Sequence, residues 1–216
     1  MCRLLYISCI QPIALSVNLA AFAETSRTSP RWQGDGWGIV FKNADGEWQS
    51  YKSLESIWNE QTVFSALPAT RFALSHVRGA FGVNTKKLEN THPFQSGKWW
   101  FAFNGNIQGM KMRVPGSIGA KKIFNLVLNE LEISKPEDAL CNVADEIARN
   151  SRYIVGLNCI LTDGEKTYVY CRWGEREDED YYAIRYYKSG DLTIVCSREY
   201  GEYPFERMKS GEVKVF

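Results

Sequence analysis

Hydrophobic and polar positions along the chain predict strands first, then two helices, then strands again. Two consecutive sets of apolar residues recur at the spacing of a helix face: Phe124, Val127, Leu128 and Leu131, followed by Leu140, Val143, Ala144 and Ile147. Shorter apolar or aromatic stretches predict strands over residues 3–8, 71–77, 98–103 and 213–216, and a run of strands over residues 154–195. Residues 57–67 are expected to be helical, and residues 15–25 to form a helix or a compact loop.

Short polar sequences mark where some of these elements turn or begin. Two apolar runs within residues 38–51 flank Asn43-Ala44-Asp45-Gly46, and an Asp-Gly step supplies the positive backbone dihedral angles of a hairpin turn. Ser134 and Glu137 have the spacing of a capping box, in which each side chain satisfies the backbone donor of the other. We therefore expect a β-hairpin over residues 38–51 and the start of the second helix near Ser134.

This order of elements indicates an α+β protein with antiparallel sheets, because a parallel α/β sheet would alternate single strands with single helices. The chain has 216 residues, of which 44% are hydrophobic, so it can bury a sizeable core. It shows no repeat, low-complexity segment or obvious linker. We expect one domain over residues 1–216.

The overall charge gives no reason to expect a nucleic acid or a membrane as a partner. Lysine and arginine number 26 against 25 acidic residues, which leaves a formal net charge of +1. No segment approaches the ~18 apolar residues of a membrane span. The expected partner is a small molecule.

The six cysteines favour a cytoplasmic protein with reduced thiols. They are widely spaced and include no CxxC pair, so neither a zinc site nor a disulfide framework is indicated, and we expect no metal or other cofactor. Ala21-Phe22-Ala23 resembles a secretory cleavage site, which leaves a secreted form as the alternative. Polar residues and Pro12 interrupt the apolar stretch before it, whereas a signal needs an apolar core of roughly 7 to 15 residues.

Cys2 is a candidate nucleophile because of its position directly after Met1. Hydrolysis of an amide needs a nucleophile, a base, and donors aimed at the developing oxyanion. Removal of Met1 would give Cys2 a free α-amine, whose reference pKa near ~7.7 to 8.0 allows it to act as the base. Position alone is weak support, because a cysteine can equally be a small apolar residue at the start of a buried strand.

Four motifs in fixed order give Cys2 a context: Gly34-Asp35-Gly36-Trp37-Gly38, Ser75-His76-Val77-Arg78, Asn90-Thr91-His92-Pro93-Phe94 and Phe101-Ala102-Phe103-Asn104-Gly105-Asn106-Ile107. With Cys2 they resemble the class II glutamine amidotransferases, in particular the compact single-domain members. The resemblance is specific from Cys2 to about Ile107, and it continues more faintly over residues 157–164 and 195–200. It implies an N-terminal nucleophile (Ntn) hydrolase fold, a four-layer αββα sandwich with two antiparallel sheets. It also implies a glutaminase that forms glutamate and ammonia through a thioester.

The resemblance assigns a role to each matching residue. Cys2 corresponds to the nucleophile, and the side-chain amide of Asn104 with the backbone N–H of Gly105 corresponds to the oxyanion hole. Arg78 corresponds to the residue that binds the α-carboxylate of the substrate, a role that suits a planar guanidinium.

Further residues of these motifs are expected around the substrate. Asp35, Gly36 and Trp37 correspond to a supporting loop beside the pocket. His92 and Phe94 correspond to residues that shape the pocket. Since the α-amine serves as the base, no histidine is needed for that purpose.

The chain departs from the family where many members have an aspartate that receives the α-ammonium of the substrate. In an ungapped alignment Gly119 replaces this aspartate and Lys121 replaces a following glutamate. Loss of one charge-assisted hydrogen bond costs roughly 1.5 to 3 kcal/mol of binding. Another acid such as Glu89 could take the role, the amine of the substrate could be blocked or absent, or the site could be inactive. A blocked amine is the sharper hypothesis, because Lys121 and Lys122 would repel an ammonium if they face the pocket.

Two other functions stay open. One is an amidase of the same superfamily that acts on peptides or acylated amines, which the combination of Arg78 with Asn104 and Gly105 disfavours. The other is a catalytically silent protein that binds an amino-acid-like ligand or a partner protein, which the departure at Gly119 favours. An active enzyme would release its ammonia or pass it to a separate ammonia-accepting subunit, because no synthase segment is left over.

Overall fold

The computed structural model describes residues 2–80 and 85–216, which fall into two compact units. The first unit comprises Met1–Pro93 and Ile184–Arg207, and the second comprises Phe94–Ala183 and Met208–Phe216. Each unit contains one antiparallel sheet with helices against one face. This confirms the expected α+β fold with two antiparallel sheets, while the single domain expected over residues 1–216 stays a prediction.

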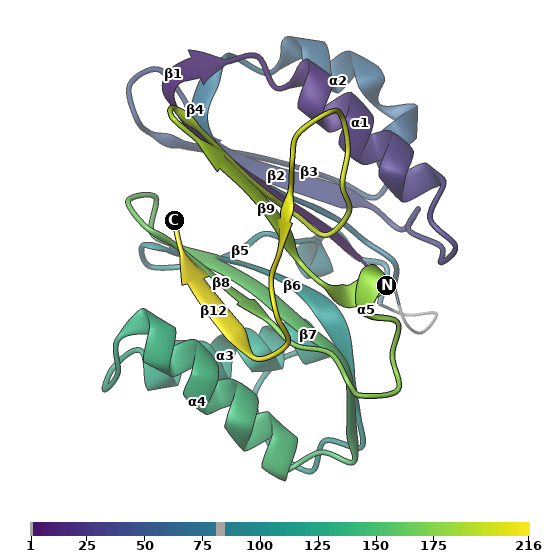
Figure 1. Ribbon diagram of the computed structural model, residues 1–216, viewed down its shortest axis with the longest axis vertical. Helices are drawn as coiled ribbons and strands as arrows, with labels where there is room; N and C mark the ends of the chain where they lie inside the picture. Colours follow the sequence, from purple (N-terminus) through teal and green to yellow (C-terminus); the bar gives the residue numbers. More distant parts are fainter. Residues whose placement is uncertain (1, 81–84) are drawn as a thin grey trace. The chain divides into compact units, whose positions relative to one another are not determined.

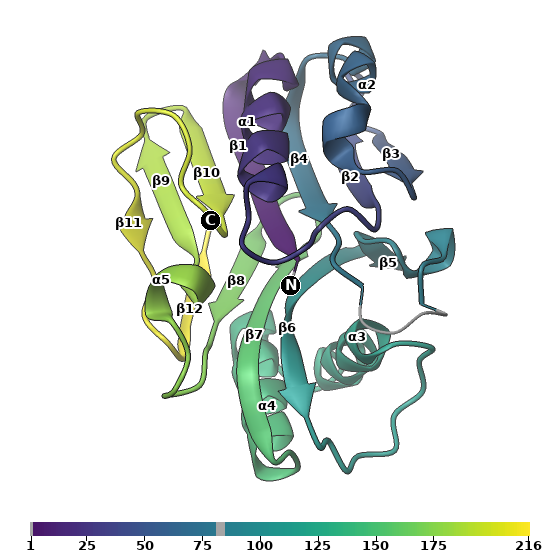
Figure 2. The same ribbon diagram turned by 90° about the vertical axis from the view of Figure 1, so that its right-hand side faces the viewer.

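Seven strands form the sheet of the first unit, in the order β11-β9-β10-β1-β4-β2-β3, which Figure 2 shows across the sheet. Their bounds are β1 (Arg3–Ile13), β2 (Trp37–Lys42), β3 (Trp48–Ser53), β4 (Thr70–Val77), β9 (Arg185–Ser189), β10 (Leu192–Cys196) and β11 (Glu206–Arg207). Strand β1 runs five residues beyond the predicted end at Ser8. The polar residues there do not end the strand, because Ile10, Gln11 and Pro12 face solvent at its far end.

Helices α1 (Ser16–Arg27) and α2 (Gln61–Ala66) pack against one face of this sheet (Figure 1). Leu19 and Phe22 of α1 and Phe64 of α2 join the buried apolar side chains of β1 and β2 in one hydrophobic core. The unit also contains two short 3-10 helices, η1 (Ile57–Asn59) and η2 (Leu88–Asn90).

The helix expected over residues 57–67 is broken at Glu60, which separates η1 from α2. The backbone of Glu60 is not helical, with φ −117° and ψ 36°. Its carboxylate accepts hydrogen bonds from Trp37 Nε1 at 2.6 Å and from the Tyr51 hydroxyl at 2.8 Å. These two bonds tie Glu60 to strands β2 and β3, which explains why the backbone leaves the helix there.

The predicted hairpin is confirmed as strands β2 and β3, which pair from Trp37 with Ser53 to Lys42 with Trp48. Its turn uses Gly46 at φ +81°, and the side chain of Asn43 accepts backbone hydrogen bonds from Asp45 and Glu47.

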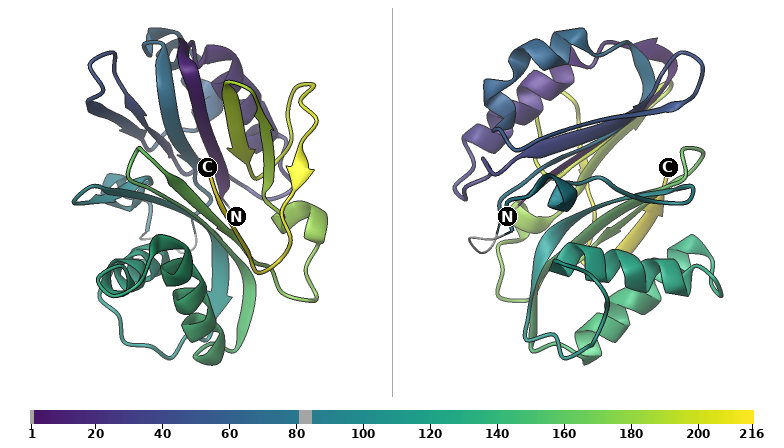
Figure 3. Two further views of the ribbon diagram at one scale, coloured as in Figure 1. Left: turned by 60° about the vertical axis from the view of Figure 1, so that its left-hand side comes forward. Right: turned by 180° about the vertical axis from the view of Figure 1, so that it is seen from behind.

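The second unit has a five-stranded sheet in the order β12-β8-β7-β6-β5. Its elements are β5 (Phe94–Ser96), β6 (Trp99–Gln108), α3 (Gly119–Glu130), α4 (Pro136–Arg149), β7 (Tyr153–Thr162), β8 (Thr167–Cys171), α5 (Glu179–Tyr182) and β12 (Glu212–Val215). Both amphipathic helices predicted from the apolar spacing are confirmed as α3 and α4, which cover one face of the sheet (Figure 3). Phe124 of α3 stacks on Phe101 of β6 with ring centroids 4.9 Å apart.

The capping box expected at Ser134 and Glu137 is wrong. Helix α4 begins at Pro136, its N-cap residue is Lys135, and no side chain caps it. The hydroxyl of Ser134 donates to the Glu130 carboxylate at 2.7 Å instead. A proline at the first helical position has no N–H to satisfy and its φ suits a helix, so the helix begins there without a box.

Among residues 2–80 and 85–216, no helix is long and apolar enough to cross a membrane. Helix α4 has 14 residues, whereas a spanning helix needs about 20 predominantly apolar ones.

Asn158 gives a test of the packing of the second unit. Its buried side chain on β7 donates to the Tyr182 carbonyl at 2.7 Å and accepts from the Arg172 backbone N–H at 3.1 Å. Asn158→Ala would remove both hydrogen bonds and leave a small void at a fully buried position, so we expect the free energy of unfolding measured in urea to fall by about 1 to 3 kcal/mol. Asn129→Ala, at an exposed position of α3, serves as the control and should stay within about 0.5 kcal/mol of the unchanged protein. If both variants unfolded at the same urea concentration, the contribution of the Asn158 hydrogen bonds to stability would be refuted.

Candidate active site

Cys2 lies directly before β1 in the first unit and is half-buried. Its thiol donates a weak hydrogen bond to the Gly79 carbonyl, with sulfur and oxygen 3.7 Å apart. Because Arg3 of β1 pairs with Val77 at the end of β4, the loop that follows β4 is brought alongside Cys2. Met1, whose removal we expect, lies outside the described residues.

The surroundings of Cys2 hold its thiol in the protonated form. Burial raises the pKa of Cys2 above that of an ordinary thiol, and the negative charge of Asp35 adds to this. The Gly79 contact and the positive charge of Arg78 act in the opposite direction. A nucleophile in this state needs a base that removes its proton.

Arg78 is a buried arginine that has one unpaired hydrogen-bond donor among the described residues. It follows β4, its side chain is only 4% exposed, and its Nη2 donates to the Thr85 carbonyl at 2.7 Å. The Nη1 atom is buried and has no hydrogen-bond partner among the described residues. Burial lowers the pKa of the guanidinium, while the nearby Cys2 and Asp35 raise it. A guanidinium with an unused buried donor is suited to a carboxylate ligand.

The Asp35 loop is joined to the Arg78 loop by backbone pairing. The Asp35 N–H donates to the Arg78 carbonyl at 3.0 Å, and the Arg78 N–H donates to the Gly36 carbonyl at 2.9 Å. The Asp35 carboxylate also accepts from the Ala80 N–H at 2.7 Å. Gly36 has φ +118°, and a Cβ atom there would lie 2.6 Å from the Ser53 carbonyl. Only glycine fits this turn without strain.

Trp37 and His92 lie deep in the first unit. Trp37 is fully buried in the hydrophobic core, from which it supports the Asp35 loop. His92 is also buried, and its ring lies against that of His76 with centroids 4.0 Å apart. Their contribution to substrate binding stays a prediction.

Asn104 and Gly105 belong to the second unit, in the middle of β6, where they pair with Asn158 and Leu157 of β7. The Asn104 side chain is 0% exposed, and neither its Nδ2 nor its Oδ1 has a hydrogen-bond partner among the described residues. A buried unpaired polar atom costs about 1 to 3 kcal/mol of stability, so such a group calls for an explanation. A Cβ atom at Gly105 would lie 2.1 Å from the Gly156 carbonyl, which excludes any other residue.

The departure from the family pattern lies at the start of α3, also in the second unit. Gly119 is the first residue of the helix, and a Cβ atom there would meet nothing within 4 Å. The Lys121 ammonium lies 5.8 Å from the ring centroid of Phe94, a buried residue at the start of β5. Glu89, the alternative acid, is exposed on η2 of the first unit.

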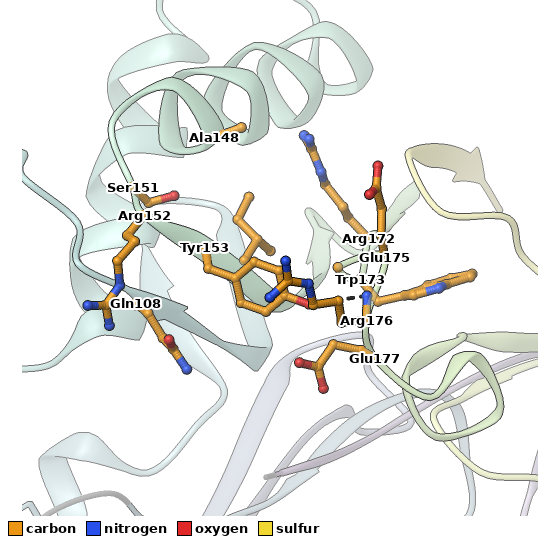
Figure 4. A pocket seen from close by; sticks show the side chains of 12 residues that line it. Gln108, Ala148, Ser151, Arg152, Tyr153, Arg172, Trp173, Glu175, Arg176 and Glu177 are labelled. Atoms are coloured by element: carbon orange, nitrogen blue, oxygen red, sulfur yellow. Dashed lines mark hydrogen bonds between the residues drawn. The ribbon is translucent and has the colours of Figure 1, made fainter.

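The second unit also contains an open hollow of about 710 Å³, which the sequence motifs do not indicate (Figure 4). It lies between the end of α4, the start of β7 and the segment after β8, and it is lined by Arg152, Tyr153, Arg172, Glu175, Arg176 and Glu177 among others. Among the described residues that line it, none is a cysteine. No group of acidic, histidine or cysteine side chains in residues 2–80 and 85–216 could hold a metal ion. The hollow therefore contains neither the candidate nucleophile nor a metal site.

Comparison with known proteins gives a consistent result. The family described as class II glutamine amidotransferases matches residues 1–186. YafJ of Escherichia coli (strain K12), whose name carries a provisional assignment to the glutamine amidotransferases, is 26% identical over 79% of this chain and 73% of its own length. The gamma-glutamyl-hercynylcysteine sulfoxide hydrolase of Mycolicibacterium smegmatis is 25% identical over 65% of this chain. The match spans 62% of that hydrolase, less than two thirds of its length.

A solved structure confirms the fold class. The glutamine aminotransferase class-II domain protein of Silicibacter pomeroyi superposes with a TM-score of 0.67, covering 99% of this chain and 94% of that one. Sequence identity in this comparison is 16%, so the likeness concerns the fold alone.

The charge of Arg78 can be tested through the reactivity of Cys2. The guanidinium favours the thiolate and thereby lowers the pKa of Cys2, so Arg78→Met should raise this pKa. We expect the rate of Cys2 alkylation by iodoacetamide, mapped by mass spectrometry across a pH series, to rise only at higher pH in the variant. Arg27→Met, which removes an exposed ion pair on α1, is the control and should leave the curve in place. A shift of the alkylation curve to lower pH in Arg78→Met would contradict the expected rise of the Cys2 pKa.

Proposed function

Because the chain belongs to the class II glutamine amidotransferases, we propose that it hydrolyses the side-chain amide of glutamine or another γ-glutamyl amide, with Cys2 as the nucleophile. The observation that carries this proposal is Asn104, whose amide is fully buried and unpaired among the described residues. Such a donor costs stability unless a ligand uses it. In this proposal the amide donates to the oxyanion together with the Gly105 N–H.

The reaction proceeds through a thioester. The α-amine of Cys2, freed by removal of Met1, takes the thiol proton, and the sulfur attacks the amide carbon. The tetrahedral intermediate collapses as its C–N bond breaks, and the α-ammonium returns the proton to the leaving nitrogen, so that ammonia or an amine departs. Water, deprotonated by the same α-amine, then attacks the thioester, which releases the γ-carboxylate and regenerates the thiol.

Arg78 selects the glutamyl part of the substrate. Its buried, unused Nη1 donor suits the α-carboxylate, and a charge-assisted hydrogen bond of this kind contributes about 1.5 to 3 kcal/mol. The Mycolicibacterium smegmatis relative supports this substrate class, since its name describes hydrolysis of a γ-glutamyl compound. In this reading Asp35, Gly36 and Trp37 hold the loop that carries Arg78, and His92 and Phe94 shape the pocket.

The remaining assignments follow from this chemistry. The reaction requires no cofactor, and ammonia either diffuses away or passes to a separate ammonia-accepting subunit. All six cysteines are free, which fits a reducing compartment such as the cytoplasm.

Covalent labelling tests the nucleophile first. We expect the intact mass of the purified protein to lack Met1 and to gain one adduct on exposure to a diazo-ketone analogue of glutamine, with the adduct mapped to Cys2. Cys2→Ala should gain none, whereas Cys9→Ala, which changes another half-buried cysteine, should be labelled as before.

Other outcomes of this measurement separate the alternatives. A retained Met1 with no adduct would favour a silent protein that binds an amino-acid-like ligand or a partner. A mass that lacks the first 23 residues would support the secreted form, in which Cys2 is lost.

Gly119 provides a test of the blocked-amine hypothesis. The site lacks an acid at the start of α3, and the space around Gly119 is open. Gly119→Asp should therefore be tolerated, since an acidic residue also suits a helix N-terminus. We expect it to shift the ratio of kcat/KM for glutamine over N-acylglutamine by about tenfold toward glutamine, because the ammonium regains a charge partner.

Gly119→Asn matches the aspartate in size without its charge and serves as the control. An unchanged ratio in Gly119→Asp, or the same shift in both variants, would refute a charge role at this position. A strong preference of the unchanged protein for glutamine would refute the blocked amine itself.

A further inference from the structure

Trp32 is the one aromatic residue among the large hydrophobic side chains that stand exposed in residues 2–80 and 85–216. It lies in the segment between α1 and β2 of the first unit, and it is 66% exposed. A tryptophan can bury a large apolar area, and it is enriched at sites where proteins bind their ligands and partners.

The indole is held in place although most of it faces solvent. Its ring packs against that of Trp58 in a T-shaped pair, with ring centroids 5.8 Å apart and an interplanar angle of 81°. Its Nε1 donates to one carboxylate oxygen of Asp35 at 3.1 Å. It also covers Gly34, where a Cβ atom would lie 2.4 Å from the indole. Holding a side chain in one position costs conformational entropy, and an exposed side chain gains little buried apolar area in return. A ring that is already held in place loses less entropy when a ligand binds to it.

The contacts of Trp32 lead to the candidate nucleophile. The second carboxylate oxygen of Asp35 accepts from the Ala80 N–H at 2.7 Å. The preceding residue, Gly79, accepts the hydrogen bond from the Cys2 thiol. The guanidinium of Arg78, by contrast, donates to Thr85. Trp32 is thus connected, through Asp35, to the loop that carries both Arg78 and the carbonyl beside Cys2. Because the buried Arg78 is assigned to the glutamyl part of the substrate, the exposed indole suits the part that extends toward solvent, the substituent on the amide nitrogen.

We propose that Trp32 binds the substituent on the amide nitrogen of the substrate, and that the preferred substrates are γ-glutamyl amides of amines that carry an aromatic ring. The exposed indole face can stack on such a ring, and aromatic pairs are favoured beyond the area they bury. This inference rests on the proposed function, because the substituent leaves with the nitrogen when Cys2 forms the thioester. The hollow of Figure 4 offers no comparable assignment, since its arginine and glutamate side chains lie together and define no ligand of one charge.

A pair of substrates that differ by one phenyl group tests the proposal. γ-Glutamyl benzylamide and γ-glutamyl methylamide both release alkylamines, and each is prepared with the α-amine free or acylated, whichever the unchanged protein hydrolyses faster. We expect the kcat/KM ratio of benzylamide over methylamide to fall by about tenfold in Trp32→Ala, whereas the ratio of glutamine over methylamide should change by less than about twofold.

Trp32→Phe separates ring stacking from positioning of Asp35. Phenylalanine keeps an aromatic face but lacks the N–H that donates to Asp35, so the benzylamide preference should be largely retained. If Trp32 only positioned Asp35, Trp32→Ala and Trp32→Phe would both lower kcat/KM for all three substrates alike. The ratio of benzylamide over methylamide would then be unchanged in Trp32→Ala, which would overturn the proposal.

Different results would refute the role of Trp32 and the proposed function. Turnover of glutamine or methylamide with an unchanged benzylamide ratio in Trp32→Ala would refute the role of Trp32 alone. Absence of turnover for every substrate, together with absence of a diazo-ketone adduct on Cys2, would refute the proposed function and with it this inference.

Discussion

The candidate site of the first unit depends on the backbone pairing between residues 35–36 and Arg78. Strands β2 and β4 pair up to Trp37 and Val77, and the hydrogen bonds between Asp35, Gly36 and Arg78 continue this ladder past the last strand residues. The Asp35 carboxylate closes it by accepting from Ala80. Together with the pairing of Arg3 and Val77, this extension holds the Gly79 carbonyl beside Cys2 and fixes the start of the Arg78 side chain. A few hydrogen bonds at the end of a sheet therefore set the geometry around the candidate nucleophile.

The buried polar atoms that have no partner among the described residues include Arg78 Nη1 in the first unit and the Asn104 amide in the second. Folding normally pairs such groups, and each unpaired one lowers stability. A sequence selected for stability alone would replace them. In the function that we propose, the substrate supplies the missing partners of both groups, since departures from the rules of stable packing are expected at functional positions.

The spacing of apolar residues correctly predicted elements that keep one face against the same neighbour along their whole length. The apolar spacing of α3 and α4 is regular because one face of each meets a sheet, and the Asp45-Gly46 turn requires a backbone that few residues adopt. The break at Glu60 was not predictable, because it depends on hydrogen bonds from Trp37 and Tyr51 that form only in the folded protein. The motifs gave the candidate site residues by resemblance, whereas the exposure of Trp32 and the residues gathered around the hollow are properties of the fold.

The Asp35 carboxylate links two properties that evolution could otherwise adjust separately. One oxygen accepts from Trp32, which we assign to substrate preference, and the other accepts from Ala80, beside the Cys2 contact. An asparagine has a single acceptor oxygen and could satisfy only one of these donors. A mutation that replaces the indole leaves one carboxylate oxygen of Asp35 without its donor. A mutation that replaces the aspartate disturbs the loop beside the candidate nucleophile. New substrate ranges in descendants of this protein should therefore arise more readily through the neighbours of Trp32 than through Trp32 or Asp35.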